Sequence, residues 1–379
     1  MTKMTKYFGT ALAAAMVLAM PVMADDTWKV GGSGPLTGDA AAYGQAVANA
    51  IEIAAEEINE AGGINGYQVE VNFQDDEHDA EKALYAYGNL KDWGVQFFEG
   101  TVTSTPCVAV AAETVNDNIF QITPSGSSPD CIANDNAFAV CFSDPAQGTM
   151  SARYIGENGL AEKVAVIYNS SDVYSSGIYE KFMTESEEQP FEVVSAEAFT
   201  ADSNKDFSVQ LQKAKDAGAD LVFLPIYYQE ASLILTQAAG MDYTPVFFGV
   251  DGMDGILGVE GFDTTLAEGV LLLTPFVATA EDELTVNFVT KYEEKFGETP
   301  NQFAADAYDG LYIIKAAAEK AGLTPDMSAS DICDAMKTAM TEITFDGLTG
   351  EQTTWDATGA PTKDPKAIVI QDGIYVAAE

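Results

Sequence analysis

Two hydroxyl-rich segments are the first places in this sequence where a ligand could be held. Residues 101–105 read Thr-Val-Thr-Ser-Thr and residues 123–128 read Thr-Pro-Ser-Gly-Ser-Ser, and each follows an apolar run typical of a strand. Hydroxyl groups beside the free N–H groups of a helix start form a suitable cradle for a carboxylate. The same residue types also serve as ordinary helix caps and turns. Sequence alone leaves both interpretations open.

Tyrosines and one aspartate form a second group of candidates, further along the chain. Tyr174, Tyr227 and Tyr228 fall in expected loops, where a tyrosine either covers a ligand or closes the edge of a core. Asp251 follows the apolar run Pro-Val-Phe-Phe-Gly-Val, so its carboxylate is placed either to bind an ammonium group or to cap the next segment.

Other chemistries fit the sequence less well. The acidic run 75–79 resembles a hard-metal site, but no calcium-loop spacing follows it, and we predict a solvated run and no metal. The glycines near residue 34 are spaced GxGxxxG, and Pro35 removes an N–H group that a phosphate would need, so no nucleotide cofactor is expected. With one histidine, His78, and no GxSxG motif, we predict no catalytic residues and no enzyme activity.

The elements that must position these loops alternate between strands and helices. Strands are expected at 28–32, 67–73, 95–99, 119–123, 163–168, 220–226, 245–250, 269–276, 353–356, 367–371 and 374–377. Helices are expected at 43–61, 80–92, 106–117, 147–157, 175–188, 206–217, 230–239, 282–296, 302–321 and 329–340. This order predicts an α/β fold with two doubly wound parallel-sheet lobes. Ligands of such sheets bind beyond the carboxyl ends of the strands, where the candidate loops lie.

Composition and the first residues restrict the location and the partners. Residues 1–24 have two lysines, a short apolar run and a small-residue exit, which predicts a secretory signal peptide cleaved near Ala24. The formal charge of −41 predicts a solvated acidic surface and excludes nucleic acid as a partner. In an oxidising compartment the four cysteines (Cys107, Cys131, Cys141 and Cys333) are disulfide candidates, and a bridge among the first three is preferred.

Several motifs together resemble one family. The stretch Gly34-Pro-Leu-Thr-Gly-Asp-Ala-Ala-Ala-Tyr43-Gly and the stretch 58–66, Ile-Asn-Glu-Ala-Gly-Gly-Ile-Asn-Gly, resemble the start of leucine/isoleucine/valine-binding proteins. The likeness continues through Asp75-Asp76, 100–105, 122–127, 206–208 and 354–359, and covers nearly all of the chain after the leader. These proteins are type I periplasmic binding proteins of ABC importers.

The resemblance implies two lobes joined by three hinge crossovers, near 142–145, 272–276 and 346–351. Lobe one would comprise 27–143 plus 275–347, and lobe two 144–273 plus 350–379. A ligand would be trapped between them by hinge closure. The implied partners are an amino acid or a related small molecule and the transmembrane subunits of an ABC permease, with the protein acting as a periplasmic monomer.

The resemblance also implies roles for individual residues. Ser104 matches the hydroxyl that binds the ligand carboxylate, Ser125 a backbone carbonyl that meets the ammonium, and Ser127 a hydroxyl and N–H group that contact both ends. Tyr174 and Tyr227 match closing tyrosines, and Asp251 matches the acidic partner of the ammonium. The pocket for the ligand side chain would be formed by Tyr43, His78, Thr103 and Phe303.

This sequence departs from the family at three of these positions. Asp251 stands where close relatives have glutamate, and His78 and Thr103 stand where well-known members carry a bridged cysteine pair. The pocket wall is therefore more polar than in a strict binder of leucine, isoleucine or valine. Alternatives are a same-fold binder of amides, urea or small carboxylic or aromatic acids, and a ligand-sensing protein.

Overall fold

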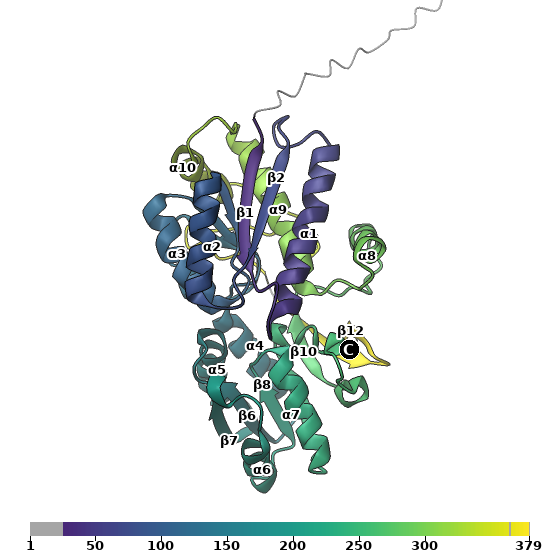
Figure 1. The fold of residues 1–379 in the computed structure, drawn as a ribbon. Coiled ribbons are helices and arrows are strands. Elements are labelled where there is room, and N and C mark those ends of the chain that lie inside the picture. Colours follow the sequence, from purple (N-terminus) through teal and green to yellow (C-terminus); the bar gives the residue numbers. More distant parts are fainter. Residues whose placement is uncertain (1–25, 364, 379) are drawn as a thin grey trace, which may run out of the picture.

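The structure is a computed structural model that describes residues 26–363 and 365–378. The predicted signal peptide at 1–24 lies outside the described residues. Within the described part the strands form two sheets, with the orders β2-β1-β3-β4-β5 and β12-β11-β10-β9-β8-β6-β7. Figure 1 shows these sheets in two lobes stacked end to end, each flanked by helices. The α/β fold with two lobes is confirmed.

Lobe one is built on a fully parallel sheet. Its strands are β1 (Trp28–Gly34), β2 (Val69–Asp75), β3 (Phe97–Glu99), β4 (Phe120–Thr123) and β5 (Ala137–Ala139). Its helices are α1 (Ala41–Glu60), α2 (Ala80–Trp93), α3 (Ser104–Asp117), α8 (Glu283–Phe296), α9 (Gln302–Ala321) and α10 (Ala329–Met340).

Helices cover both faces of this sheet because successive strand side chains point to opposite sides. Phe97 packs in the cluster that contains α1 and α9, while the next residue, Phe98, packs in the cluster of α2 and α3. Both rings are completely buried. The α8 helix lies against α1, where Lys295 forms an ion pair with Glu56 at 2.6 Å.

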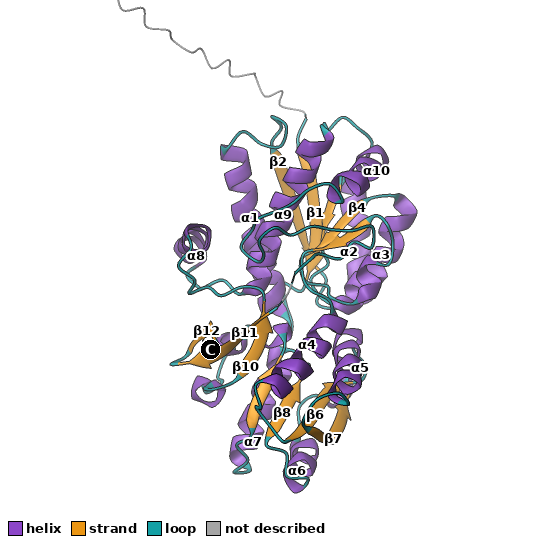
Figure 2. Ribbon diagram, turned by 180° about the vertical axis from the view of Figure 1, so that it is seen from behind, coloured by secondary structure: helices purple, strands orange, loops and turns teal. Residues whose placement is uncertain are grey.

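Lobe two contains a mixed sheet. Its strands are β6 (Lys163–Asn169), β7 (Glu192–Phe199), β8 (Leu221–Leu224), β9 (Val246–Gly249), β10 (Leu271–Thr274), β11 (Lys366–Gln371) and β12 (Ile374–Ala377). Its helices are α4 (Asp144–Glu157), α5 (Val173–Ser186), α6 (Ser208–Asp216) and α7 (Tyr228–Gly240). The strands β6 to β10 are parallel, whereas β11 and β12 add an antiparallel hairpin at the edge, visible beside β10 in Figure 2.

Two strands were missed by the sequence prediction and one predicted strand is absent. The missed strands are β5, which has three residues, and β7, an edge strand whose side chains are mostly exposed or half-buried. Such strands lack the continuous apolar run that marks a central parallel strand. The segment predicted as a strand at 353–356 has no strand in the described residues, and its Trp355 forms an isolated bridge with Pro361.

The chain crosses between the lobes three times: from β5 to α4, from β10 to α8, and from α10 to β11. The last crossing comes later than the predicted 346–351. Trp355 Nε1 donates to the Ala139 carbonyl at 2.8 Å, and Ala139 N donates to the Gly359 carbonyl at 2.9 Å. Residues 355–359 therefore lie against β5 of lobe one, although the predicted lobe two began at residue 350.

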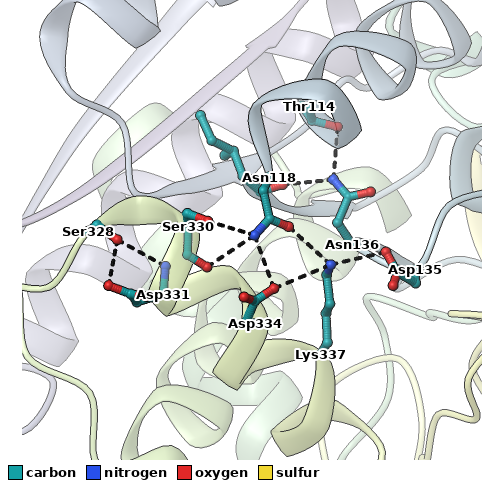
Figure 3. A network of polar contacts seen from close by, with 10 residues as sticks. Thr114, Asn118, Asp135, Asn136, Ser328, Ser330, Asp331, Asp334 and Lys337 are labelled. Carbon is teal, nitrogen blue, oxygen red and sulfur yellow. Dashed lines mark hydrogen bonds and ion pairs between the residues drawn. The ribbon is translucent and has the colours of Figure 1, made fainter.

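A polar network fixes α10 to the end of α3 (Figure 3). Asn118 ends α3 in the left-handed conformation, and its Nδ2 donates to Ser330 Oγ at 2.8 Å and to Asp334 Oδ1 at 3.0 Å. Lys337 Nζ donates to Asn118 Oδ1 at 3.0 Å and forms an ion pair with Asp135 at 3.1 Å. The contacts of the Asn118 amide are solvent-exposed and the Lys337 side chain is half-buried. Because they join two helices, we assign them a role in docking α10 rather than in binding a ligand.

Candidate functional site

A small cavity lies between the lobes at the carboxyl ends of their strands. About 220 Å³ of space not filled by atoms lies among its lining residues, part of it open to solvent. Its lining residues come from both lobes: Tyr43, Val102, Thr103, Ser104, Ser125, Tyr174, Tyr227, Asp251, Gly252 and Phe303.

The wall from lobe one is formed by hydroxyl groups at the start of α3. Ser104 is the first residue of α3, and its Oγ accepts hydrogen bonds from the backbone N–H groups of Ser127 and Ser128, both at 3.2 Å. Ser125 Oγ donates to the Val102 carbonyl at 2.7 Å, which ties the two serine-rich loops together. The first N–H groups of a helix have no partner within the helix and carry a partial positive charge. This wall can therefore bind a carboxylate without a lysine or arginine.

The wall from lobe two presents one buried carboxylate. Asp251 is 4% exposed, and Tyr174 donates its hydroxyl proton to Asp251 Oδ1. Gln147 binds the other carboxylate oxygen, because its Nε2 donates to Asp251 Oδ2 at 3.0 Å. Its Oε1 also accepts from the backbone N–H of Asp251 at 3.2 Å. Burial raises the pKa of Asp251 to about 7, against the opposing effect of the Tyr174 and Gln147 hydrogen bonds. A cationic group in the cavity would favour the ionised form.

Aromatic rings close the cavity between these two walls. The rings of Tyr174 and Tyr227 are stacked with centroids 4.8 Å apart, and those of Tyr43 and Phe303 lie 4.4 Å apart. The Tyr43 hydroxyl donates across the lobe boundary to the Gly252 carbonyl and accepts from Tyr228 N at 3.2 Å. These contacts join α1 of lobe one to two segments of lobe two.

Gly252 is required by the closeness of this packing. A Cβ atom at this position would lie 2.6 Å from the Tyr174 hydroxyl and 2.9 Å from Tyr227 Cδ1. Both distances are shorter than real Cβ contacts, so a larger residue would displace one of the rings.

The structure brings most of the predicted site residues together. Eight of them line the cavity: Tyr43, Thr103, Ser104, Ser125, Tyr174, Tyr227, Asp251 and Phe303. His78 lies one layer behind, with its Nδ1 2.8 Å from Thr103 Oγ1 and its ring edge-on to Tyr227. Burial lowers the pKa of His78. Ser127 donates its N–H to Ser104 Oγ, and this residue lines a neighbouring cavity together with Cys141 and Lys363.

Sequence reasoning missed Gln147, which positions Asp251. Gln147 is completely buried on α4, and nothing in its local sequence separates it from a solvated glutamine. Its role depends on how α4 packs against the segment after β9, which local sequence does not determine.

The predicted disulfide is not formed. Cys107, Cys131, Cys141 and Cys333 are all buried free thiols. The thiols of Cys107 and Cys131 lie beside each other and interact as a hydrogen-bonded pair. Cys107 Sγ also accepts from Gln121 Nε2 at 3.5 Å, and Cys131 Sγ donates to the Ser104 carbonyl at 3.8 Å. Two of the three cysteines preferred for a bridge are therefore neighbours, although no bridge joins them.

The acidic run after β2 has structural partners. Asp75 accepts from Leu36 N at 2.8 Å and from Thr37 Oγ1 at 2.6 Å, while Asp76 accepts from Ser33 Oγ at 3.1 Å. Asp79 caps α2 by accepting from Lys82 N at 3.0 Å. The run therefore holds the β1–α1 loop and the start of α2, and part of it is buried rather than solvated as predicted.

Comparison with known proteins assigns the family. A profile described as "Periplasmic binding protein" matches residues 27–373. The chain belongs to the periplasmic binding protein family. Members of this family bind substrates for transport, and the leucine-binding resemblance seen in the motifs is confirmed.

Individual relatives cover most of the chain. It is 31% identical over 82% of its length to "Leu/Ile/Val-binding protein homolog 3" of Brucella melitensis, covering 83% of that protein. It is 29% identical over 81% of its length to the "Leucine-, isoleucine-, valine-, threonine-, and alanine-binding protein" of Pseudomonas aeruginosa, covering 83% of it. The chain is also similar to the branched-chain amino acid transporter substrate-binding protein LivJ from Streptococcus pneumoniae, whose crystal structure contains isoleucine. The two sequences are 30% identical, and the structures match with a TM-score of 0.84 over 93% of this chain and 99% of that chain.

The family places this protein outside the cytoplasm. Within residues 26–363 and 365–378, none of the helices has the length and apolar composition needed to cross a bilayer.

Proposed function

We propose that this protein is the substrate-binding component of an ABC importer and holds an α-amino acid between its lobes. The observation that carries the proposal is the pairing of two chemically different walls across one cavity. Ser104 and the start of α3 offer neutral donors to a carboxylate, and the buried Asp251 offers a negative charge to an ammonium group. The amino-acid binding named for the Brucella and Pseudomonas relatives supports the same ligand class.

The ligand side chain would occupy the space beside Tyr43, Phe303 and Thr103. Two aromatic rings favour an apolar side chain, while the Thr103 hydroxyl, bonded to His78, adds a polar group to the same wall. The close packing of these two rings, with centroids 4.4 Å apart, favours small or medium side chains over large ones. We therefore expect the branched-chain amino acids, alanine and threonine to be the strongest candidates.

The remaining parts of the proposal concern location and assembly. We propose that the leader at 1–24 directs the chain to the periplasm and is removed near Ala24, and that the protein acts as a monomer. It would catalyse no reaction, since its role is to carry a ligand to the permease.

A thermal-shift screen tests the ligand class. The mature protein would be scanned with the twenty common amino acids and with urea, propionamide and benzoate. A ligand at 100 times its Kd adds about 2.7 kcal/mol to the free energy of unfolding, which gives a clear rise in melting temperature.

We expect a rise with at least one of the candidate amino acids, and its loss in Asp251→Asn but not in Ser151→Ala. Ser151 is a buried serine on α4 that does not line the cavity. A rise with urea, propionamide or benzoate and with none of the amino acids would replace the amino-acid assignment by the amide or acid alternative.

A further inference from the structure

A turn of lobe two is bound to the start of a lobe-one helix beside the cavity. The turn, residues 251–254, has Asp251 at its start and Asp254 at its end, and Asp254 N donates to the Asp251 carbonyl at 2.9 Å. The helix is α9, whose first residue is Gln302 and whose second residue, Phe303, lines the cavity. The contact between turn and helix therefore lies next to the ligand site and across the lobe boundary.

Gln302 contacts both ends of this turn. Its backbone N–H donates to Asp254 Oδ2 at 2.9 Å, and its side-chain Nε2 donates to the Asp251 carbonyl at 3.1 Å. Gln302 is 2% exposed and Asp254 is 5% exposed, so both hydrogen bonds are shielded from water. Hydrogen bonds to a charged group are among the stronger ones in proteins, and burial strengthens them further.

The α9 helix does not need Asp254 as its cap. Asn301 already caps the helix, because its side chain accepts from Ala304 N at 3.1 Å. Asp254 accepts instead from an N–H group that a helix leaves unpaired, at the end that carries a partial positive charge. The contact is therefore additional to local capping, and its carboxylate comes from the opposite lobe.

Lobe two holds the Asp254 side chain in place for this contact. The next residue, Gly255, donates its N–H to the hydroxyl of Tyr375 on β12 at 3.1 Å. Burial raises the pKa of Asp254 to about 6, against the opposing effect of hydrogen bonds from Gln302, Gly255 and Tyr375. A carboxyl group with this pKa is ionised at pH 8, so it meets the start of α9 as an anion.

An exposed ion pair at the lobe boundary is a weaker contact. Lys205 of lobe two and Asp39 of lobe one lie 3.4 Å apart, but their side chains are 70% and 71% exposed. Ion pairs of this kind contribute little, because water competes for both charges. The buried carboxylate of Asp254 is the stronger candidate for holding the lobes together.

We propose that Asp254 and Gln302 form a latch that stabilises the closed form of the two lobes. The latch consists of the two hydrogen bonds from Gln302, one to the Asp254 carboxylate and one to the Asp251 carbonyl. The inference rests on the proposed function, in which closure traps a ligand, and names residues that hold the lobes after the ligand has entered. Separation of the lobes would break both hydrogen bonds and return Asp254 to water. Such a latch changes affinity without touching the ligand, because apparent affinity depends on the population of the closed form.

Two substitutions at one position isolate the backbone hydrogen bond. Gln302→Ala removes only the side-chain bond to the Asp251 carbonyl. Gln302→Pro also removes the N–H group, and proline is well tolerated at the first position of a helix. The preceding Asn301 has the extended backbone that a residue before proline prefers. Calorimetry at pH 8 should give an affinity for L-leucine about tenfold lower in Gln302→Pro than in Gln302→Ala. Equal affinities in the two variants would refute the latch.

Asp254→Ala tests the same hydrogen bond from the other lobe. Affinity for leucine should fall about tenfold. Stopped-flow measurements should show this loss in the dissociation rate, with the association rate unchanged, because the latch forms only after the ligand has entered. The loss should be the same for leucine, valine and alanine, since Asp254 does not line the cavity. A loss confined to one of the three ligands would assign Asp254 to the ligand pocket and overturn the proposal.

The double variant and a matched control separate the latch from a purely structural role. In Asp254→Ala/Gln302→Pro the two losses should not add, because each substitution removes the same bond. Asp282 is a control because it caps α8 within lobe one, where it accepts from Thr285 N at 2.9 Å. Asp282→Ala should lower stability in urea and leave leucine affinity unchanged. Small-angle X-ray scattering at saturating leucine should show a larger open fraction in Asp254→Ala than in Asp282→Ala or wild type.

Failure of the latch and failure of the proposed function give different results. Wild-type leucine affinity and dissociation rate in Asp254→Ala would refute the latch and leave the amino-acid proposal standing. If urea, propionamide or benzoate binds the wild-type protein and no amino acid does, the amino-acid assignment fails, and the same variants test the latch with that ligand. If none of these compounds binds, both proposals fail.

Discussion

The substitution Asp251→Asn should stabilise the ligand-free protein while it removes binding. Burial raises the pKa of Asp251 from 3.8 to about 7, so at pH 8 an ionised carboxylate costs the folded protein on the order of 4 kcal/mol, at about 1.4 kcal/mol for each pH unit. Asparagine removes this cost. It also loses an acceptor for Tyr174 or Gln147, which costs about 1–3 kcal/mol. The net gain is about 2 kcal/mol at pH 8, the difference between these two costs.

The sign of the pH dependence follows from the raised pKa. Between about pH 4 and pH 7 the folded wild-type protein holds a proton on Asp251 that the unfolded chain has released, so its stability increases as the pH falls. The advantage of the variant should therefore shrink from pH 8 and be close to zero near pH 5.5. Affinity for an amine-bearing ligand should fall on the order of 100-fold in the variant, because a buried charge pair is lost.

Urea unfolding at pH 8 and pH 5.5 measures the stability, and calorimetry measures the binding. A matched control is Asp306→Asn, which replaces another buried aspartate and leaves its partner Lys363 without a counter-charge. This variant protein should be less stable than wild type by about 3–5 kcal/mol. The reasoning is refuted if Asp251→Asn is destabilised at pH 8 as strongly as this control, or if its stability relative to wild type does not change with pH.

Two further substitutions test the packing of the site, and a third tests the buried ion pair between Lys363 and Asp306. Gly252→Ala forces Tyr174 away from its present position, and we expect about a tenfold or greater loss of affinity, measured by calorimetry, with the fold retained in circular dichroism. Tyr43→Phe removes hydrogen bonds that cross the lobe boundary and should reduce ligand affinity about tenfold. X-ray scattering of the liganded variant should show a larger fraction of open molecules. Unchanged affinity would contradict this role of Tyr43. Lys363→Met leaves the Asp306 carboxylate buried without its partner and should lower the free energy of unfolding, measured in urea at pH 8, by about 3–5 kcal/mol. The loss should be much smaller at pH 4.5, because burial raises the pKa of Asp306 and the carboxyl can take up a proton there.

The fold was largely predictable because its helices have a strong apolar period. The predicted ranges 302–321 and 329–340 agree with α9 and α10, and the first predicted helix, 43–61, differs from α1 by two residues at its start and one at its end. The edge strand β7 was missed because its residues alternate weakly and remain partly exposed. Strands of this kind are stabilised by pairing with a neighbour, here β6, and their own sequence carries little of that signal.

The site was predictable to the extent that parallel strands bring their carboxyl ends together. Ser104, Ser125 and Asp251 each follow a strand, and the structure places all three around one cavity. Gln147 lies on a helix instead, and its orientation depends on the packing of α4 against the segment after β9. Its burial and its hydrogen bonds to Asp251 are visible only after the chain is folded.

The division of the site between the lobes leads to a last prediction, about ligands that carry one charged end. Lobe one offers neutral donors around Ser104, and lobe two offers the carboxylate of Asp251, so each end of a zwitterion is expected to contact a different lobe. Isoamylamine and 4-methylpentanoate each retain one charged end of leucine and should bind at least 100-fold more weakly than leucine.

Neither analogue should close the lobes, because a ligand shifts the equilibrium toward closure only by its extra contacts in the closed form. Small-angle X-ray scattering would then show a decrease in radius of gyration with leucine and none with either analogue at saturating concentration. Closure by the amine alone would mean that the acidic wall determines closure, and the carboxylate contact at α3 would lose its assigned role.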